Sequence, residues 1–436
     1  MPNPWPLAWA DLGRNRLGSI AIMLLVALAV ALGVAVSAQE RALRQGSARA
    51  ADAFDILIGA PSSETQLVLS TVYLQPAAID LVDGRHLAAL AANPDVRFAA
   101  PLGFGDSWRG HPVVGSTAEF VTRGGQLPLS EGRVFARIDE VVVGADVPLA
   151  IGQGFTATHG HVEIDESEHH DALTYRVVGR LPHQGNPWDG AIMAPIEAVW
   201  WIHSLPVGHK VDDAALWPEG HDAHDRDHEH EHEHEADAHA APDLSAIPIG
   251  PPWDADELPG TPAIVVKPAS FAAAYTIRQH YRSLPDTMAV FPAEVLVQLY
   301  ALLGDVRDLV ATISLLTQIL VLGAVLLAVV TSLAQRRRLI GVLRALGASR
   351  GYIFACVWVS VASVLTLGSL LGLGVGWLGA VGVSLLFERR TGIALPVSLS
   401  GQELLLVAII VGIGLVLAAV PAAFAFRGST AAALRA

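Results

Sequence analysis

Residues 335–350 read QRRRLIGVLRALGASR, and this basic stretch separates two long runs without any charge, Leu309–Gln335 and Gly351–Phe387. Two further runs of the same kind are Leu17–Ala38 and Leu404–Phe426. An α-helix needs about 20 apolar residues to cross the roughly 30 Å of hydrocarbon in a bilayer. Each run is long enough, so the sequence predicts an α-helical membrane protein with four transmembrane helices.

The third run, Gly351–Phe387, is too long for one straight span and is rich in glycine. Small residues allow membrane helices to approach each other closely, and glycine also weakens a helix. The run is therefore expected to pack closely against a neighbouring helix, or to bend, at some of its glycines: Gly368, Gly372, Gly374, Gly376, Gly379 and Gly382.

The composition agrees with a membrane protein that also has a large part in water. Apolar residues make up 52% of the 436 residues, charged residues only 16%, and the mean hydropathy is +0.44. The apolar content excludes a disordered chain, and the single cysteine excludes a disulfide scaffold. Residues 38–306 hold 38 of the 42 acids, 16 of the 28 bases and all 17 histidines, which leaves this insert at −22 and the remainder at +8.

Arginines beside the apolar runs predict the orientation, because cytoplasmic loops of membrane proteins are enriched in Lys and Arg. Arg14 and Arg16 precede the first run, five arginines lie between 336 and 350, and Arg427 follows the fourth run. Four spans then place both termini and the loop 336–350 in the cytoplasm, and the acidic insert outside. The first run has 22 residues, more than the 7–15 of a signal-peptide core, so it is expected to remain as an uncleaved membrane anchor.

The insert between the first and second spans mixes strand and helix patterns and is expected to form a large extracytoplasmic α/β domain. Pro292 suits the first turn of a helix, and from there to Ala334 only glycines, Gly304 and Gly323, interrupt the helical pattern. A continuous helix of that length would extend roughly 60 Å, twice the bilayer core, and form a stalk. The strand-like segments are 54–58, 141–143, 161–164, 175–178 and 263–267, and the helix-like segments are 87–92 and 271–281.

The basic loop between the second and third spans is expected to be an amphipathic helix. Leu339, Leu343 and Leu346 form an apolar stripe, with the arginines off it. Gly347 can end this helix and Ser349 can cap the next one. Such a helix would lie against the inner face of the membrane; the alternative is a basic loop that only sets the topology.

The segment RRLIGVLRALGAS at 337–349 closely resembles the coupling-helix motif of the MacB/FtsX-type ABC transporter permeases, which include the LolC/LolE lipoprotein-release subunits. LAWADLGRNRL at 7–17 is similar to the amphipathic N-terminal helix of that family, and the region 421–435 is similar to its C-terminal end. One span, a large insert and three further spans is also the family's layout. The sequence departs from the motif at Arg338 and Leu339, where the family usually has an acidic residue.

This resemblance implies a permease that forms a homodimer or a paralogous heterodimer, rests its coupling helix on a separate ABC ATPase and acts on cargo by mechanotransmission. It also implies a location in the bacterial cytoplasmic (inner) membrane, and a periplasmic or outer-membrane partner is compatible with it. The chain is expected not to be an enzyme: its only lysines, Lys210 and Lys267, do not lie in a Gly-x-x-x-x-Gly-Lys-Ser/Thr loop, so ATP would bind the partner subunit. The coupling residues would be Arg337, Arg338, Leu339, Gly341, Val342, Leu343, Arg344, Leu346 and Gly347.

Together, these patterns predict the following division of the chain. An N-terminal amphipathic helix at 1–16 and a tail at 427–436 are cytoplasmic. The extracytoplasmic domain, 39–305, would contain a porter-like part at 50–125 and 258–300, as the family resemblance suggests, a β-rich inserted lobe at 126–215 and a His-rich loop at 219–240. The transmembrane helices are 17–38, 306–335 (with the end of the stalk), 351–387 and 404–426, joined by the coupling helix 336–350 and an outer loop 388–403.

Histidines form two candidate metal sites in the insert. Imidazole and carboxylate together suit Zn²⁺ or another divalent transition metal, and the composition of the longer tract predicts a disordered loop with loose, multi-site binding. The plainer explanations are a solvated charged loop and a polar turn of a hairpin. The first tract contains His221, His224, His228, His230, His232, His234 and His239, and the second contains His159, His161, His169 and His170; His183, Trp188, His203 and His209 are expected to be scattered surface or packed residues.

The leading interpretation is a permease subunit for export or release of a substrate, with a metal-linked substrate as one option. The alternative is a membrane-anchored extracytoplasmic metal-binding or sensing module, but an anchor needs no amphipathic arginine loop. A metallohydrolase would need an ordered His-Glu-x-x-His helix, and the nearest match, at 228–232, lies in low-complexity sequence. Acidity and the outside location argue against nucleic acid as a partner. The sequence leaves the cargo open.

Overall fold

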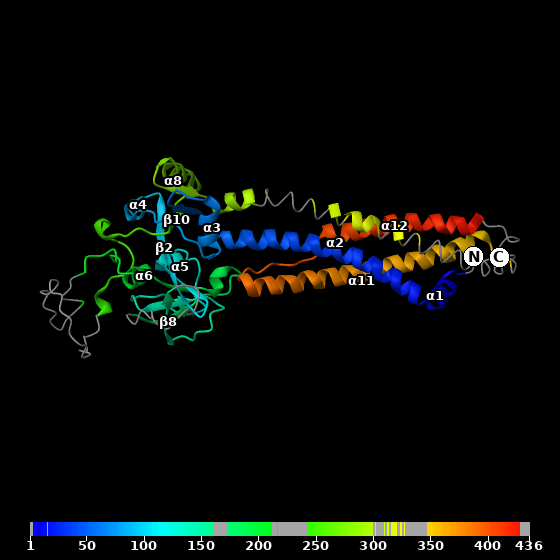
Figure 1. Ribbon diagram of the computed structural model, residues 1–436, viewed down its shortest axis with the longest axis horizontal. Coiled ribbons are helices and arrows are strands. Elements are labelled where there is room, and N and C mark those ends of the chain that lie inside the picture. Colours follow the sequence, from blue (N-terminus) through cyan, green and yellow to red (C-terminus); the bar gives the residue numbers. More distant parts are fainter. Residues whose placement is uncertain are drawn as a thin grey trace, which may run out of the picture. The chain divides into compact units, whose positions relative to one another are not determined.

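The computed structural model describes residues 3–14, 16–159, 173–211, 216, 243–299 and 347–427, with short stretches at 301, 309, 312–313, 315–320, 323–324 and 327. Contacts divide the chain into two compact units, and Figure 1 shows the elements of both. The membrane unit comprises Met1–Gly46, Tyr300–Arg390 and Ala394–Ala436. The α/β unit comprises Ser47–Leu299 and Thr391–Ile393.

Long helices build the membrane unit. They are α1 (Trp5–Arg14), α2 (Arg16–Ala51), α11 (Arg350–Thr391) and α12 (Gly401–Arg427). By length and composition α2, α11 and α12 are candidate membrane spans, which confirms three of the four expected ones. The remaining expected span, 309–335, lies mostly outside the described residues.

Helix α2 is longer than the apolar run that predicted it. The run ends at Ala38, but the helix continues to Ala51 and reaches 36 residues, or about 54 Å. The segment 39–51 contains no proline, and Glu40 pairs with Arg44 one turn along the helix. Since nothing in this polar segment breaks the helix, it keeps the conformation that the apolar run begins.

Three glycines on one face of α11 bring this helix against α2. A Cβ atom at Gly372 would lie 2.5 Å from the carbonyl oxygen of Ala27, and one at Gly376 would lie 2.6 Å from that of Ala31. Gly368 makes the equivalent approach one turn earlier. The expected close packing is therefore present at this spacing, within one uninterrupted helix. The other glycines of the run have no atom within 4 Å of a Cβ position: Gly374, Gly379 and Gly382.

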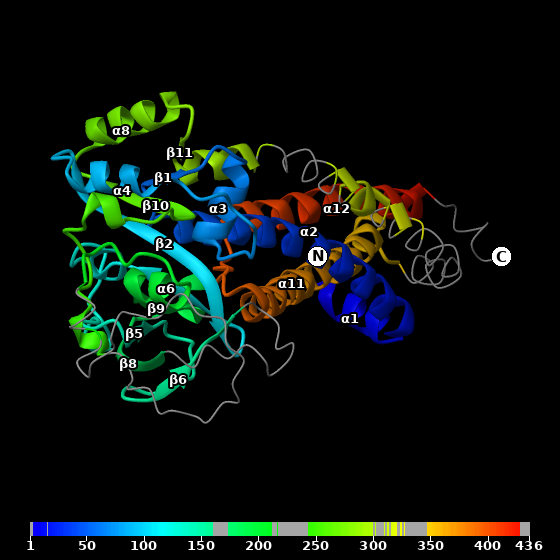
Figure 2. The ribbon, with the colours of Figure 1, turned by 60° about the vertical axis from the view of Figure 1, so that its left-hand side comes forward.

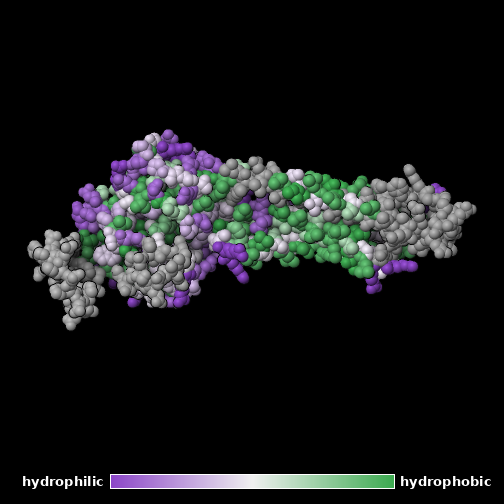
Figure 3. Space-filling model, in the orientation of Figure 1, coloured by the Kyte–Doolittle hydropathy of each residue, from purple (hydrophilic) through white to green (hydrophobic). Residues whose placement is uncertain are grey.

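The membrane unit has a small core and a hydrophobic surface. Its core joins α2, α11 and α12 through Val30, Leu365 and Val407, among others. Leu28, Leu378 and Leu405 are 70%, 62% and 61% exposed on the same helices, and Figure 3 shows the hydrophobic surface that such side chains form. A continuous apolar surface of this kind is rare on a soluble protein and fits contact with lipid.

The α/β unit contains one mixed sheet of 11 strands, in the order β11-β1-β10-β2-β3-β9-β5-β8-β4, with β6 paired to β8 and β7 to β2. The strands are β1 (Ile56–Gly59), β2 (Val96–Trp108), β3 (His111–Ser116), β4 (Glu131–Gly132), β5 (Glu140–Val143), β6 (Gly154–Thr156), β7 (Thr158–His159), β8 (Thr174–Arg180), β9 (Ile192–Pro195), β10 (Ala263–Pro268) and β11 (Met288–Val290). The expected α/β fold class of the insert is confirmed. Four of the five expected strands are present, and the fifth, 161–164, lies outside the described residues.

The long strand β2 connects the two halves of this sheet (Figure 2). Its first part pairs with β10 and its later part with β3, and the register with β3 shifts between Gly103 and Asp106. One hydrophobic cluster, with Ile58 and Ile264, lies along the first half, and a second cluster, with Val141 and Tyr175, lies along the other. The insert therefore has two cores on one sheet.

Helices pack on the sheet and close both cores. They are α3 (Glu64–Val72), α4 (Gly84–Ala91), α5 (Ala118–Val121), α6 (Ile196–Ile202) and α8 (Phe271–Ser283), with 3₁₀ turns at Pro187–Gly190, Leu244–Ala246 and Ala255–Glu257. Helix α6 comes close to the sheet because two strand residues there are glycines: a Cβ at Gly103 would lie 2.8 Å from the Ile196 side chain, and one at Gly115 2.6 Å from Val199. Both helices expected in the insert, at 87–92 and 271–281, correspond to α4 and α8.

Candidate functional site

The predicted coupling residues lie at the edge of what the structure describes. Gly347 is described and has φ +94°, a conformation that suits a residue ending a helix. Ser349 caps α11 as expected, because its Oγ accepts the N–H of Tyr352 at 3.2 Å. The other predicted coupling residues, Arg337, Arg338, Leu339, Gly341, Val342, Leu343, Arg344 and Leu346, lie outside the described residues.

Most of the predicted metal ligands also lie outside the described residues. His159 is described; it belongs to β7 and pairs with Asp106 of β2. The remaining candidates, His161, His169, His170, His221, His224, His228, His230, His232, His234 and His239, fall in segments that the structure does not describe. The metal hypothesis for both tracts therefore stays a prediction.

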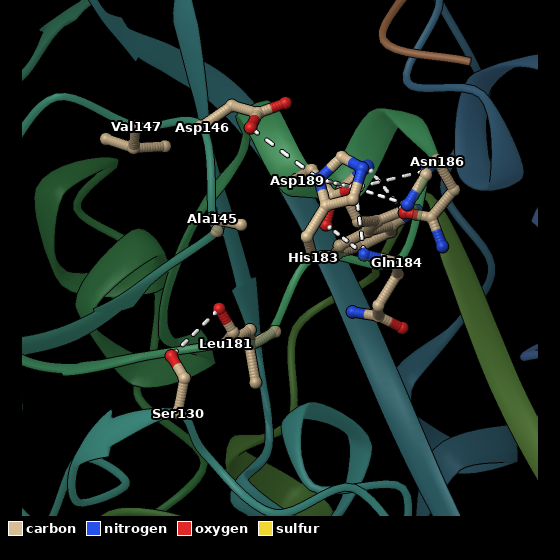
Figure 4. A network of polar contacts seen from close by, with 12 residues as sticks. Ser130, Ala145, Asp146, Val147, Leu181, His183, Gln184, Asn186 and Asp189 are labelled. Carbon is tan, nitrogen blue, oxygen red and sulfur yellow. Dashed lines mark hydrogen bonds and ion pairs between the residues drawn. The ribbon is translucent and has the colours of Figure 1, made fainter. Parts of the chain in front are cut away.

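A group of metal-compatible side chains does occur elsewhere, in the loops beside β5 and β9 (Figure 4). Ligand atoms of Asp146, His183 and Asp189 all lie within 4.8 Å of one another. His183 Nδ1 is 3.2 Å from Asp189 and 3.7 Å from Asp146. The sequence gives no signal for this group, because Asp146 lies 37 residues before His183 and the spacing of His183 and Asp189 matches no recognisable metal motif.

The Asp189 carboxylate has a structural role that does not need a metal. Its side chain is 1% exposed and accepts backbone N–H groups from Gln184, Gly185 and Asn186 at 2.6–3.2 Å. Burial raises the pKa of Asp189, while these N–H groups and the neighbouring His183 oppose the shift. The donor set could hold a divalent cation, but the hydrogen bonds already account for the position of the carboxylate: it fixes the turn at 184–186.

The α/β unit also contains an open cavity of about 590 Å³. It lies between the end of α3, the extended segment that follows it, the later part of β2 and the start of β3. Most of its lining is apolar, including Leu74, Ile79, Leu81, Phe104 and Pro112. Its volume is in the range of small-molecule sites, and its lining suits an apolar group better than a charged one.

The membrane unit contains a polar group that the sequence analysis did not identify. We call it the Glu403 cluster: Ser37 and Arg41 of α2, Ser398 and Ser400 before α12, and Glu403 in the first turn of α12. Glu403 is fully buried and its Oε1 accepts hydrogen bonds from Arg41 Nη1 at 2.7 Å and Ser37 Oγ at 2.8 Å. Its Oε2 accepts the N–H and the hydroxyl of Ser400 at 2.8 and 2.6 Å. Arg41 also donates to Ser400 Oγ and to the Ser398 carbonyl.

One half of this cluster had a sequence signal. Ser400 and Glu403 form the S-x-x-E pattern of a capping box, in which the glutamate accepts the N–H of the N-cap residue. The partnership with Arg41 had no signal, since 362 positions separate the two residues. The cluster ties the first and last of the spans that the structure describes by specific hydrogen bonds.

The fold and these sites define a class: a helical membrane protein with a large α/β domain inserted after its first span. The basic residues beside the spans predict that this domain is extracytoplasmic. Residues 311–430 match the FtsX-like permease C-terminal family. This region of the chain is accordingly an FtsX-like permease C-terminal domain.

Two solved structures of related transporter domains are only weakly similar to the chain. No curated protein sequence matches the chain. The periplasmic region of MacB from Actinobacillus actinomycetemcomitans is similar at 11% identity, over 58% of this chain and 95% of that chain, with a TM-score of 0.31. The extracellular domain of the noncanonic ABC-type transporter YknZ from Gram-positive bacteria is similar at 10% identity, over 54% of this chain and 98% of that chain, with a TM-score of 0.26.

Proposed function

We propose that this permease couples ATP hydrolysis by a separate ABC ATPase to movement of its extracytoplasmic α/β domain, and thereby exports or releases a substrate. The observation that carries the proposal is the FtsX-like permease match over 311–430. The continuity of α2, one helix from Arg16 to Ala51, supports it. A helix that continues from an apolar span into the sequence of the domain is a means of passing movement from one to the other. We further propose that the permease works as a dimer.

The contact with the ATPase is assigned to the loop between the second and third spans. Its apolar stripe, with Leu343 and Leu346, would lie in a groove of the ATPase, as the resemblance of 337–349 to a coupling helix implies. Two aspartates placed there would put charge into an apolar contact, which is unfavourable without a partner.

The experiment is to express Leu343→Asp/Leu346→Asp with the partner ATPase and to measure both association and ATP hydrolysis in membranes. We expect insertion of the permease to be unchanged and association with the ATPase to be lost. Ala345→Asp is the control for charge, because it adds one negative charge to the same loop but off the stripe, and each single variant, Leu343→Asp and Leu346→Asp, is compared with it. Association of the double variant at the wild-type level would contradict the coupling assignment.

We propose, secondly, that the tract between His221 and His239 binds a divalent transition metal such as Zn²⁺. The observation that favours it is the alternation of seven histidines with carboxylates. Protons compete with metal for imidazole, so binding should be strong at neutral pH and be lost through about pH 6. Calorimetric zinc titration of the tag-free chain with and without 220–240 tests it; equal stoichiometry in the two would refute the proposal.

A further inference from the structure

The Glu403 cluster joins two helices at one end of their apolar segments. Arg41 follows the first apolar run by three residues, and Glu403 immediately precedes the fourth run. The predicted orientation of the chain therefore places both residues at the extracytoplasmic ends of their spans. We propose that Arg41 and Glu403 are positioning residues that hold α12 and α2 in one fixed register, so that the two helices move as a single body. The inference rests on the proposed function for its role in transport.

Burial makes the contact all-or-none. The Glu403 side chain is 0% exposed and that of Arg41 is 19% exposed. A buried carboxylate without its cation is strongly unfavourable, whereas the intact pair with satisfied oxygens is tolerated. Small displacements of α12 along α2 would leave the carboxylate unpaired, so the helices either keep this register or separate completely.

Directional hydrogen bonds set the register where apolar packing does not. Beyond the cluster, Val30 of α2 and Val407 of α12 belong to one apolar core, and apolar contacts are non-directional. The Glu403 oxygens instead accept four hydrogen bonds, two from α2 and two from Ser400. Arg41 adds a bond to the Ser398 carbonyl. The cluster therefore fixes α2, the segment before α12 and the first turn of α12 together.

The position of the cluster along α2 gives it a mechanical consequence. Arg41 lies ten residues before the end of α2 at Ala51, which is about 15 Å of rigid helix. α12 is part of the region that matches the permease family. Any displacement of α12 that leaves the cluster intact would move the outer end of α2 by the same amount.

The test measures the register directly, by spin-label distances in the full-length chain reconstituted in nanodiscs with its ATPase. Labels go on two exposed residues that flank the cluster, Gln45 of α2 and Gln402 of α12, in a Cys356→Ser background. For the native cluster we expect one narrow distance peak that is the same with and without ATP. In Glu403→Gln, which keeps the shape but removes the charge, we expect that single peak to be lost.

The matched control is Arg44→Ala. Arg44 lies on the same helix and pairs within α2, with Glu40, rather than with α12, so its removal should leave the narrow peak intact. The rescue variant is Ser37→Cys/Glu403→Cys treated with a short thiol cross-linker in a chain labelled through non-cysteine chemistry. A covalent tie should restore the narrow peak that the untreated double variant lacks.

The outcomes separate this inference from the proposed function. A narrow peak that persists in Glu403→Gln, or cross-linking that fails to restore it, would overturn the positioning role. So would a native distance that changes on addition of ATP. The narrow native peak and its loss in Glu403→Gln can be measured without the ATPase. If no ATPase binds the wild-type chain, the proposed function fails while the register result still stands or falls by itself.

Discussion

At the scale of single residues, the α/β unit depends on buried carboxylates that hold loops in place. Glu140 on β5 is 8% exposed at its side chain and pairs with both Nη atoms of Arg133. It also accepts the N–H of Ala136 at 2.8 Å. The hydrogen bond from Arg133 lowers the pKa of Glu140, with burial opposing it. A carboxyl group with a lower pKa in the folded state stabilises the fold above its unfolded pKa, and this stabilisation is lost as pH falls through the folded pKa.

We therefore expect Glu140→Gln to reduce the free energy of unfolding of the α/β unit at neutral pH by about 1–2 kcal/mol; the value is modest because solvent screens the half-exposed Arg133. The wild type should lose stability as the pH falls below the ordinary range of a glutamate, and the variant should depend less on pH there. Urea unfolding followed by tryptophan fluorescence at a series of pH values measures both. Glu131→Gln, at an exposed position on β4, is the control. Parallel pH profiles for wild type and Glu140→Gln would contradict the assignment.

How far single residues could be predicted depended on whether their partners were local. Ser349 was predicted as a cap because capping involves residues three positions apart, and the capping box of Ser400 and Glu403 was open to the same reasoning. Arg41 was not predicted as the partner of Glu403, nor Asp146 as a neighbour of His183. In both cases the tertiary fold creates the contact, and neither spacing nor composition encodes it.

At the scale of elements, the packing of α11 on α2 follows from glycines spaced four residues apart. The sequence predicted either close packing or a bend, because it could not show which glycines face a neighbour. The helical period places Gly368, Gly372 and Gly376 on one face, and that face meets the backbone of α2. The length of α2 exceeds the prediction for a related reason. The apolar run marks only the part of the helix that lies in lipid, and the polar residues 39–51 continue the helix beyond it.

This packing predicts different effects for two neighbouring glycines. Gly372→Val should weaken the contact of α11 with α2, since its Cβ alone would lie 2.5 Å from the Ala27 carbonyl oxygen; overpacking of this kind costs about 1–3 kcal/mol. Gly374→Val makes the same chemical change in the same helix where no atom lies within 4 Å. We expect the first variant to show a lower thermal transition in detergent and the second to match the wild type. Equal transitions would show that the glycine face does not stabilise the helix pair.

At the scale of the whole molecule, uneven composition carried most of the predictive information. A basic, apolar frame and an acidic insert separate the membrane helices from the α/β domain without any knowledge of tertiary contacts. The sheet was less accessible: its strands were recognised individually, but their order, with β10 beside β2 and β11 beside β1, joins residues far apart in sequence. The single long strand β2, which joins two cores into one sheet, has no signal in the local pattern.

The sequence predicts four spans, and three of them are candidate spans among the described residues. Four spans require Gly347 to be cytoplasmic and Leu399 to be outside, together with Asp256 of the α/β unit. Single cysteines at these positions, in a Cys356→Ser background, can be labelled in spheroplasts with a membrane-impermeant maleimide. We expect Asp256→Cys and Leu399→Cys to react at once and Gly347→Cys to react only after lysis. No other apolar run between Asp256 and Gly347 is long enough to cross the membrane. If the run 309–335 did not cross it, Gly347 would therefore lie on the same side as Asp256 and would be labelled in intact spheroplasts. The basic loop would then face outward, and no cytoplasmic ATPase could reach it.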